Sequence, residues 1–366
     1  PTTETQYAYS HNVQSNKIRK TLPTKVVEKN ILTGVSATTT YSYDTYGFPL
    51  VVQQTFNDGF SIKKENTYKH NNKVGDKYIL GYLERQKTTS TKNGNSLIEQ
   101  YYTPVINTNI WQPIVAILIK GDKQSLQHTY GYDTHGNITQ DIEYAYSGSS
   151  FTSKYEYDSK GRIVKSINPL GLTNLFSYDA QGNLASSTDI YGNKTTYTYD
   201  AFGREISRKT PDGIICNTSY EWSDNVGLYE VSVSQNNAPT TTTYYDAQQR
   251  IVRKSQKRIN GNFCKTDFVY DSYGNLSKSS LPFQYSPSAI TWNIYSYDSY
   301  NRIVSERQAD GHVTSYKYSK NAVTTEKDGI ATSRTYDSQG NITKVSDPSG
   351  SIVYNLAPDG QPNTIV

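Results

Sequence analysis

The chain has 366 residues, of which 34% are hydrophobic, and a formal net charge of +4. Its Lys and Arg residues are scattered, so nucleic-acid binding is not indicated, and no stretch reaches the roughly 20 apolar residues of a membrane-spanning helix. So polar a composition is typical of disorder, but 34 Tyr residues and abundant Thr favour strands with half-buried rings. The length would allow two average domains. The lack of Met and the first residue, Pro1, indicate a mature or excised piece of a larger protein.

Residues 1–129 carry one clear copy of a repeat, at Tyr43-Asp44, and are otherwise irregular. Their most apolar run is Ile110–Ile119, in which Pro113 favours a sheet edge or a break over a continuous helix. We expect this run to be structural core, with a partner-binding strip as the alternative. The first predicted region is therefore an irregular N-terminal β segment, residues 1–129, with one repeat.

From about Tyr130 to the C-terminus the chain is built by repetition. Tyr-Asp occurs nine times, and in seven cases a Gly follows three residues after the Asp. The nine pairs are Tyr43-Asp44, Tyr132-Asp133, Tyr157-Asp158, Tyr178-Asp179, Tyr199-Asp200, Tyr245-Asp246, Tyr270-Asp271, Tyr297-Asp298 and Tyr336-Asp337. The fullest unit is Tyr155-Glu-Tyr-Asp-Ser-Lys-Gly-Arg-Ile163. Such self-similarity marks an array, so residues 130–366 are predicted to be one tandem-repeat region without a linker.

Each unit predicts a β-hairpin. The aromatic residue two places before the motif Tyr lies on the same strand face, so a unit places two stacked rings together, as at Tyr155 and Tyr157. The Asp opens a type I turn, and the Gly takes its fourth position, where a left-handed conformation costs little. The predicted structural turn residues are Asp133, Gly136, Asp158, Gly161, Asp179, Gly182, Asp200, Gly203, Asp271, Gly274, Asp337 and Gly340. Gln249 and Asn301 replace the Gly in two units, and we expect a distorted or different turn at Gln249.

A second reversal joins consecutive units, as in Asn168-Pro-Leu-Gly171, which is a strong turn signal. From Asp133 to Asp200 the motif aspartates are 25, 21 and 21 residues apart, which leaves room for two strands and two turns but for no helix of normal length. A degenerate copy at Tyr220-Glu-Trp222 fills the longer step that follows. The predicted fold class is all-β, with tandem hairpins that form a long antiparallel sheet.

The sequence offers few candidates for catalysis or metal binding. Cys216 and Cys264 cannot build a multi-Cys zinc site, and we expect two free half-buried thiols, with a disulfide as the alternative. The five His residues are far apart and are expected on the surface or in strands rather than as ligands or bases. One Asp per unit is too sparse for a calcium cage of about six to eight oxygens. An enzyme domain within residues 45–129 is disfavoured because no triad or metal set occurs there. We assign no catalytic residue, no metal ligand and no cofactor.

The units at Tyr157–Ile163, Tyr178–Leu184 and Tyr199–Arg204 resemble the YD repeats of the RHS-repeat family. The resemblance extends from Tyr130 to about Tyr354. It implies a sheet that spirals into part of a hollow shell, as in bacterial polymorphic and insecticidal toxins, whose shells enclose a C-terminal toxic domain. Wall-associated proteins and the animal teneurins carry related repeats. The family's autoproteolytic Asp site and Arg-rich plug motif have no match here, so the resemblance brings no catalytic residue.

The sequence therefore predicts a non-enzymatic β-shell segment of a large RHS/YD-repeat protein that is secreted from, or lies on the surface of, a bacterium. Its expected partners are the remainder of its own polypeptide and an enclosed C-terminal cargo (toxin) domain, with a secretion-apparatus or cell-surface partner as a further expectation. No nucleic acid and no membrane span are expected. The alternative is a cell-surface adhesin or carbohydrate-binding module, in which exposed Trp222 and Trp292 stack on sugars.

Overall fold

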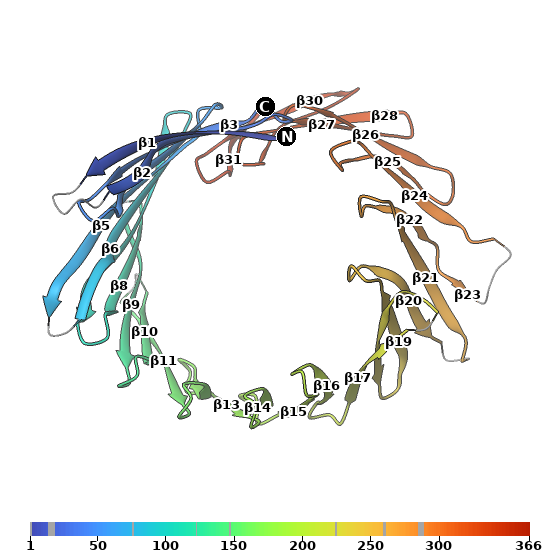
Figure 1. Ribbon diagram of the computed structural model, residues 1–366, viewed down its shortest axis with the longest axis horizontal. Coiled ribbons are helices and arrows are strands. Elements are labelled where there is room, and N and C mark those ends of the chain that lie inside the picture. Colours follow the sequence, from blue (N-terminus) through green and yellow to red (C-terminus); the bar gives the residue numbers. More distant parts are fainter. Residues whose placement is uncertain are drawn as a thin grey trace. The chain divides into compact units, whose positions relative to one another are not determined.

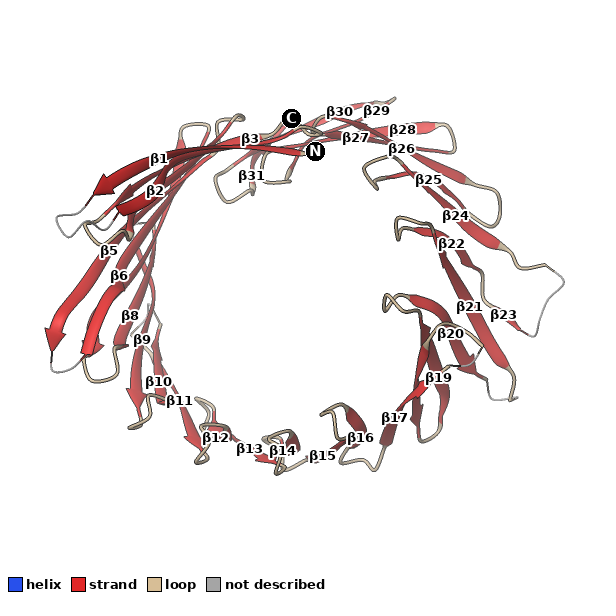
Figure 2. Cartoon of the chain, in the orientation of Figure 1, coloured by secondary structure: helices blue, strands red, loops and turns tan. Residues whose placement is uncertain are grey.

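The computed structural model describes residues 2–13, 19–74, 77–121, 123–145, 148–223, 225–258, 261–284 and 289–366. These residues form strands and turns, and no helix occurs among them (Figure 2). None of them belongs to a helix long and apolar enough to cross a membrane. The all-β class built from tandem hairpins is therefore confirmed.

The described residues contain 31 strands, labelled in chain order in Figure 1. They are β1 (Thr3–Val13), β2 (Arg19–Asn30), β3 (Ser36–Tyr43), β4 (Pro49–Phe56), β5 (Ser61–Val74), β6 (Lys77–Lys92), β7 (Asn95–Asn107), β8 (Gln112–Lys120), β9 (Lys123–Tyr132), β10 (Ile138–Tyr144), β11 (Ser150–Tyr157), β12 (Ile163–Ile167), β13 (Thr173–Tyr178), β14 (Leu184–Thr188), β15 (Lys194–Tyr199), β16 (Glu205–Lys209), β17 (Ile215–Trp222), β18 (Tyr229–Gln235), β19 (Ala238–Tyr245), β20 (Ile251–Lys257), β21 (Phe263–Tyr270), β22 (Leu276–Ser280), β23 (Phe283–Gln284), β24 (Trp292–Tyr297), β25 (Ile303–Arg307), β26 (Val313–Ser319), β27 (Ala322–Lys327), β28 (Ile330–Tyr336), β29 (Ile342–Asp347), β30 (Gly350–Leu356) and β31 (Pro362–Ile365).

The strands pair antiparallel with their neighbours in sequence. This pattern runs from β1 to β11, from β12 to β22 and from β28 to β31. The exception is the short strand β23, which pairs with β21 while β22 pairs with β24. Because neighbouring strands are joined by short turns, nearly all ladder hydrogen bonds are local in sequence.

Two compact units make up the chain. Unit 1 comprises residues 1–154, 317–324 and 330–366, and unit 2 comprises residues 155–316 and 325–329. Unit 1 therefore contains both the first and the last hairpins of the chain. This division follows contacts in space, whereas the division at residues 129 and 130 follows the regularity of the sequence repeat.

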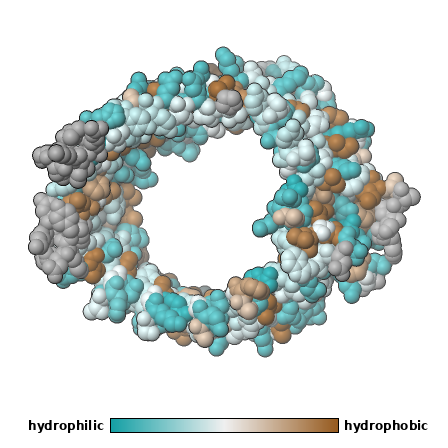
Figure 3. Space-filling model, viewed as in Figure 1, coloured by the Kyte–Doolittle hydropathy of each residue, from teal (hydrophilic) through white to brown (hydrophobic). Residues whose placement is uncertain are grey.

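The sheet has little central core. Among the described residues, the buried apolar side chains are Val26, Ala37, Phe60, Ala116 and Leu356. Most strand residues are half-buried, and apolar and polar side chains are interspersed on the face seen in Figure 3. Tyr suits such a sheet, since its ring packs while its hydroxyl reaches water or a backbone carbonyl.

The apolar run Ile110–Ile119 forms a turn and most of β8 rather than a buried block. Ala116 is its buried residue, and the rest of β8 is half-buried apart from its exposed ends. Pro113 pairs with Ile106 of β7, whereas the register with β9 begins only at Val115. Pro113 thus lies beyond the doubly paired part of the strand, a place that tolerates a missing N–H.

Candidate functional site

One turn geometry recurs at all nine Tyr-Asp positions. In the turn that opens at Asp179, the Gly182 N–H donates to the Asp179 carbonyl at 3.1 Å and the Asp179 N–H donates to the Asn183 carbonyl at 2.9 Å. The seven motif glycines have φ between 76° and 103°. The strand register shifts directly beside the turn, as between Ser177 and Tyr178, the last two strand residues before Asp179. This is a type I turn followed by a left-handed bulge residue, which fixes hairpin register.

The Asp carboxylate binds both the backbone of its turn and the side chain after the Gly. In one unit, Asp158 Oδ1 accepts the N–H groups of Lys160 and Arg162 at 2.9 and 3.0 Å, and its Oδ2 accepts Arg162 Nε at 2.8 Å. These bonds lower the pKa of Asp158, and the backbone N–H of Arg162 makes the largest contribution. Other units use Asn instead: the Asn137 side chain binds Asp133 at 2.9 Å and is the main cause of its lowered pKa.

The residue after the Gly is therefore part of the site, although sequence reasoning placed only Asp and Gly there. The partners are Asn137, Arg162, Asn183, Arg204, Arg250, Asn275, Arg302 and Asn341. The sequence carries the signal, since eight of the nine units have Asn or Arg at this place and the ninth has Phe48. Both side chains carry N–H donors long enough to reach back to a carboxylate four residues earlier.

The expectation of a distorted turn at Gln249 is wrong. Gln249 has φ of 63°, and its N–H donates to the Asp246 carbonyl at 3.0 Å, as a Gly would. Asp246 Oδ1 also accepts the N–H groups of Gln248 and Arg250, each at 2.9 Å. These bonds hold the turn in shape and outweigh the steric cost of a left-handed Gln.

Motif tyrosines in at least six units join their hairpin to the one before it. The Tyr178 hydroxyl donates to the Ile163 carbonyl at 2.8 Å, and the Tyr199 hydroxyl donates to the Leu184 carbonyl at 3.0 Å. The same bond links Tyr43 to Pro23, Tyr132 to Pro113, Tyr270 to Ile251 and Tyr297 to Leu276. This role explains why Tyr rather than Phe occupies the position.

Arginines after the turn also bridge consecutive units. The Arg162 guanidinium carbon lies 4.3 Å from the centre of the Tyr178 ring, and Arg250 lies 4.6 Å from that of Tyr270. Ring pairs within a unit, as the sequence suggested, occur at Tyr41 and Tyr43 (stacked, 6.1 Å) and less regularly at Tyr130 and Tyr132 (tilted, 6.4 Å). Tyr, Asp, Gly and Asn or Arg therefore form one linked set that repeats along the chain.

One motif aspartate makes a contact far along the sequence. Asp337 is buried and forms an ion pair with the buried Lys92, 245 residues away, at the end of β6. Next to it the Ser338 N–H donates to Asp58 Oδ2 at 2.9 Å. The Lys92 ammonium lies 5.9 Å from the centre of the buried Phe60 ring. We call these five residues the seam; all belong to unit 1, and they bind the hairpin β28–β29 to the β4–β5 turn and the β6–β7 turn.

Electrostatics favour the charged form of the seam carboxylate. Burial acts to raise the pKa of Asp337, but the bonds from Lys92 and Asn341 outweigh it and lower the pKa. A single uncompensated charge at this site would be costly, so each partner requires the other.

Cysteine, histidine and carboxylate side chains are the usual ligands of a metal site. Within the described ranges, no three His, Cys, Asp or Glu side chains gather to hold a metal ion. Cys216 and Cys264 are free and half-buried. Three histidines each meet a single carboxylate: His70 with Asp44 at 2.9 Å, His128 with Asp141 at 2.7 Å and His312 with Asp328 at 2.8 Å.

The chain is thus a repeat protein of tandem β-hairpins, in which one turn motif recurs nine times and tyrosine hydroxyls link several hairpins to the preceding one. The RHS Repeat family model matches residues 178–215 and 322–352, which confirms the resemblance to RHS repeats over these two segments. No curated protein matches it in sequence.

Two solved structures share the fold over 100% of this chain. They are the crystal structures of TcdB2-TccC3, at 10% identity, and of TcdB2-TccC3-TEV, at 9% identity, each with a TM-score of 0.73. The match covers 28% and 30% of those chains, so this chain spans less than a third of their length.

Proposed function

We propose that the chain is a structural, non-enzymatic segment of the wall of a hollow β-shell, and that the shell encloses a cargo domain of the same large polypeptide. The partners of the chain are then the remainder of that polypeptide and its C-terminal cargo. The intact protein acts outside the bacterial cell or on its surface.

The seam is the observation that carries this proposal. In an open array of hairpins, each hairpin needs contacts only with its neighbours. Such an array does not need a buried ion pair between hairpins that are far apart in the sequence. Here hairpins 245 residues apart share the buried Lys92–Asp337 pair, and the Asp58–Ser338 bond spans 280 residues. A wall that encloses cargo requires such a closing contact, whereas a linear adhesin does not.

The repeat motif fits the same role. Its carboxylates bind their own turns, its hydroxyls bind the preceding hairpin, and its arginines bridge units, so the motif groups described here are used in building the wall. Many equivalent sites suit a structural material, whereas a catalytic site needs one special constellation. The TcdB2-TccC3 chains, which share the fold and are over three times as long, support placing this segment within a larger polypeptide.

Protease protection of the full-length protein tests the proposal. The cargo should resist trypsin in native buffer and should be cut rapidly in urea that unfolds the wall. A cargo cut equally fast in both conditions would exclude enclosure. A separately expressed cargo domain is the control, since it shows whether the domain is intrinsically resistant to trypsin.

A further inference from the structure

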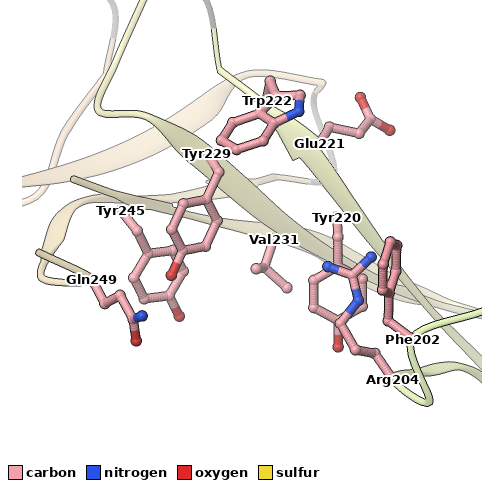
Figure 4. Close-up of a pocket in the computed structure, with 9 residues that line it drawn as sticks. All are labelled: Phe202, Arg204, Tyr220, Glu221, Trp222, Tyr229, Val231, Tyr245 and Gln249. Carbon is pink, nitrogen blue, oxygen red and sulfur yellow. The ribbon is translucent and has the colours of Figure 1, made fainter. Parts of the chain in front are cut away.

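An aromatic cleft in unit 2 breaks the repeat pattern. The cleft has a volume of about 780 Å³, within the range of small-ligand sites, and is lined chiefly by Phe202, Arg204, Tyr220, Trp222, Tyr229 and Tyr245. Figure 4 shows these side chains gathered around one space, with Val231 between them. It lies at the degenerate repeat, where the Tyr-Asp turn is absent.

The cleft arises because β17 and β18 run further than the strands of a regular unit. Tyr220 follows its turn glycine Gly213 by seven residues, as Tyr178 follows Gly171, and so occupies the motif Tyr position. The strand continues for two more residues and adds Trp222 to the same face.

The added residues complete a row of three rings. Trp222 is the direct cross-strand partner of Tyr229, and Tyr229 is the partner of Tyr245. The rings of Tyr229 and Tyr245 are stacked, with an interplanar angle of 9° and centres 4.9 Å apart. Across adjacent strands the three rings span about 10 Å. Trp222 ends the row and is 77% exposed, so most of its surface is open to a ligand.

Polar groups border the rings. Within the described part of the chain, the hydroxyls of Tyr220, Tyr229 and the motif residue Tyr245 make no hydrogen bond to the preceding hairpin, unlike those of Tyr178, Tyr199 and Tyr270. Gln249 stands beside Tyr245 (Figure 4). Arg204 stacks on Tyr220 at 4.1 Å, and Asp200 neutralises it through a bond of 2.6 Å. The site therefore offers flat apolar faces bordered by tyrosine hydroxyls and the Gln249 amide, with one carboxylate, Glu221, on its rim.

We propose that this cleft binds a neutral saccharide through Trp222, Tyr229 and Tyr245. A sugar ring presents a C–H face that packs on an aromatic face and hydroxyls that pair with the bordering tyrosines and amide. An apolar peptide would cover those polar groups without pairing them, which is costly. An anionic glycan finds no free positive charge, because Arg204 is paired with Asp200. This inference does not depend on enclosure of a cargo.

Tryptophan fluorescence tests the proposal on the intact chain. Trp111 and Trp292 are changed to Phe, so that Trp222 alone reports, and the protein is titrated with cellotetraose, with chitotetraose and, as an anionic probe, with a heparin tetrasaccharide. A neutral oligosaccharide should give a saturable change. By calorimetry on the otherwise unchanged chain, Trp222→Ala should weaken binding at least tenfold, and Tyr229→Phe should weaken it less. Trp292→Phe is the matched control and should bind as the parent does.

Several outcomes would overturn the inference. The inference fails if neither neutral oligosaccharide saturates the fluorescence signal at millimolar concentration. It also fails if Trp222→Ala keeps the parent melting temperature and binds the oligosaccharide as tightly as the parent does. Tighter binding of the heparin fragment, or of an acetyl-Leu-Phe-Leu-Phe peptide, would assign the cleft to another class of ligand. Because the Trp222 side chain is largely exposed, Trp222→Ala should remove little packing and should fold as the parent does. A loss of binding in this variant is therefore a binding defect.

Discussion

At the scale of single residues, each position of the motif has its own task. Asp binds the backbone of its turn, Gly supplies the left-handed bulge, Asn or Arg binds the Asp, and the Tyr hydroxyl reaches the preceding hairpin. Since their turn bonds lower the pKa of the motif carboxylates Asp133 and Asp158, the stabilisation is present above their usual pKa and is lost as acid protonates them.

Gln249→Gly should stabilise the chain. The left-handed conformation at Gln249 costs a non-Gly residue about 1 kcal/mol or more, and Gly removes this cost. Part of the gain is offset because Gly loses more backbone entropy on folding. Urea unfolding should therefore show a gain of up to about 1 kcal/mol. Gln248→Gly, one residue earlier in the same turn, is the control and should not stabilise. A loss of stability in Gln249→Gly would contradict this account of the turn.

Tyr132 should make the chain sensitive to alkali. Burial, followed by the neighbouring Tyr130, raises the pKa of Tyr132 to about 12 from its usual 10.0. Its contribution to stability is therefore complete below about pH 10 and is lost as the pH rises through about 12. The difference in urea midpoint between the parent and Tyr132→Phe should shrink across this interval. A difference that stays constant with pH would contradict the prediction, because it would show that deprotonation of the Tyr132 hydroxyl removes no stability.

At the scale of elements, the hairpin is the unit of stability, and it depends on its neighbours. Several units are tied to the one before them by a tyrosine hydroxyl bond, and Arg162 and Arg250 add ring stacking with the following unit. Few side chains are fully buried, so no central core couples distant hairpins. An array of this kind has stability that is approximately a sum of units and their nearest interfaces.

A change in one turn should therefore have local effects. Gly182→Val places a branched residue at φ of 103° and puts its Cβ 3.2 Å from Arg162 Nη1, so about 1–2 kcal/mol or more should be lost. Hydrogen exchange should rise in β13, β14 and the preceding hairpin. The hairpin β28–β29 should keep its protection. Uniform loss of protection along the chain would contradict the array description.

Local chemistry explains what the sequence could predict. The Asp and Gly of the turn act within five residues, so the hairpins and the all-β class follow from the sequence. The Gln249 turn was mispredicted because hydrogen bonds from Asp246 outweigh the intrinsic preference of Gln. The seam was missed because nothing near Lys92 or Asp337 in sequence indicates that they meet. The tyrosine bonds join residues 15 to 21 positions apart, a spacing visible only once hairpin register is known.

At the scale of the whole molecule, the seam is the feature that a stack of neighbours does not explain. Lys92 and Asp337 have side-chain exposures of 8% and 3%, and removing one partner of such a buried pair typically costs about 3–5 kcal/mol. Lys63 and Glu65 offer a matched surface pair, with exposures of 41% and 39%, that should contribute less than about 1 kcal/mol. Enclosure, as we propose it, depends on the buried pair and not on the exposed one.

The most direct test measures the rate of cargo cleavage by trypsin in the full-length protein carrying Lys92→Met. We predict faster cleavage than in the parent, partial recovery in Lys92→Met/Asp337→Asn, where the buried Asp337 charge is removed as well, and parent behaviour in Lys63→Ala. Hydrogen exchange at the Ser338 amide reports whether the seam has loosened. If that amide exchanges faster in Lys92→Met while cargo cleavage stays at the parent rate, the seam does not close the wall, and the central claim is contradicted.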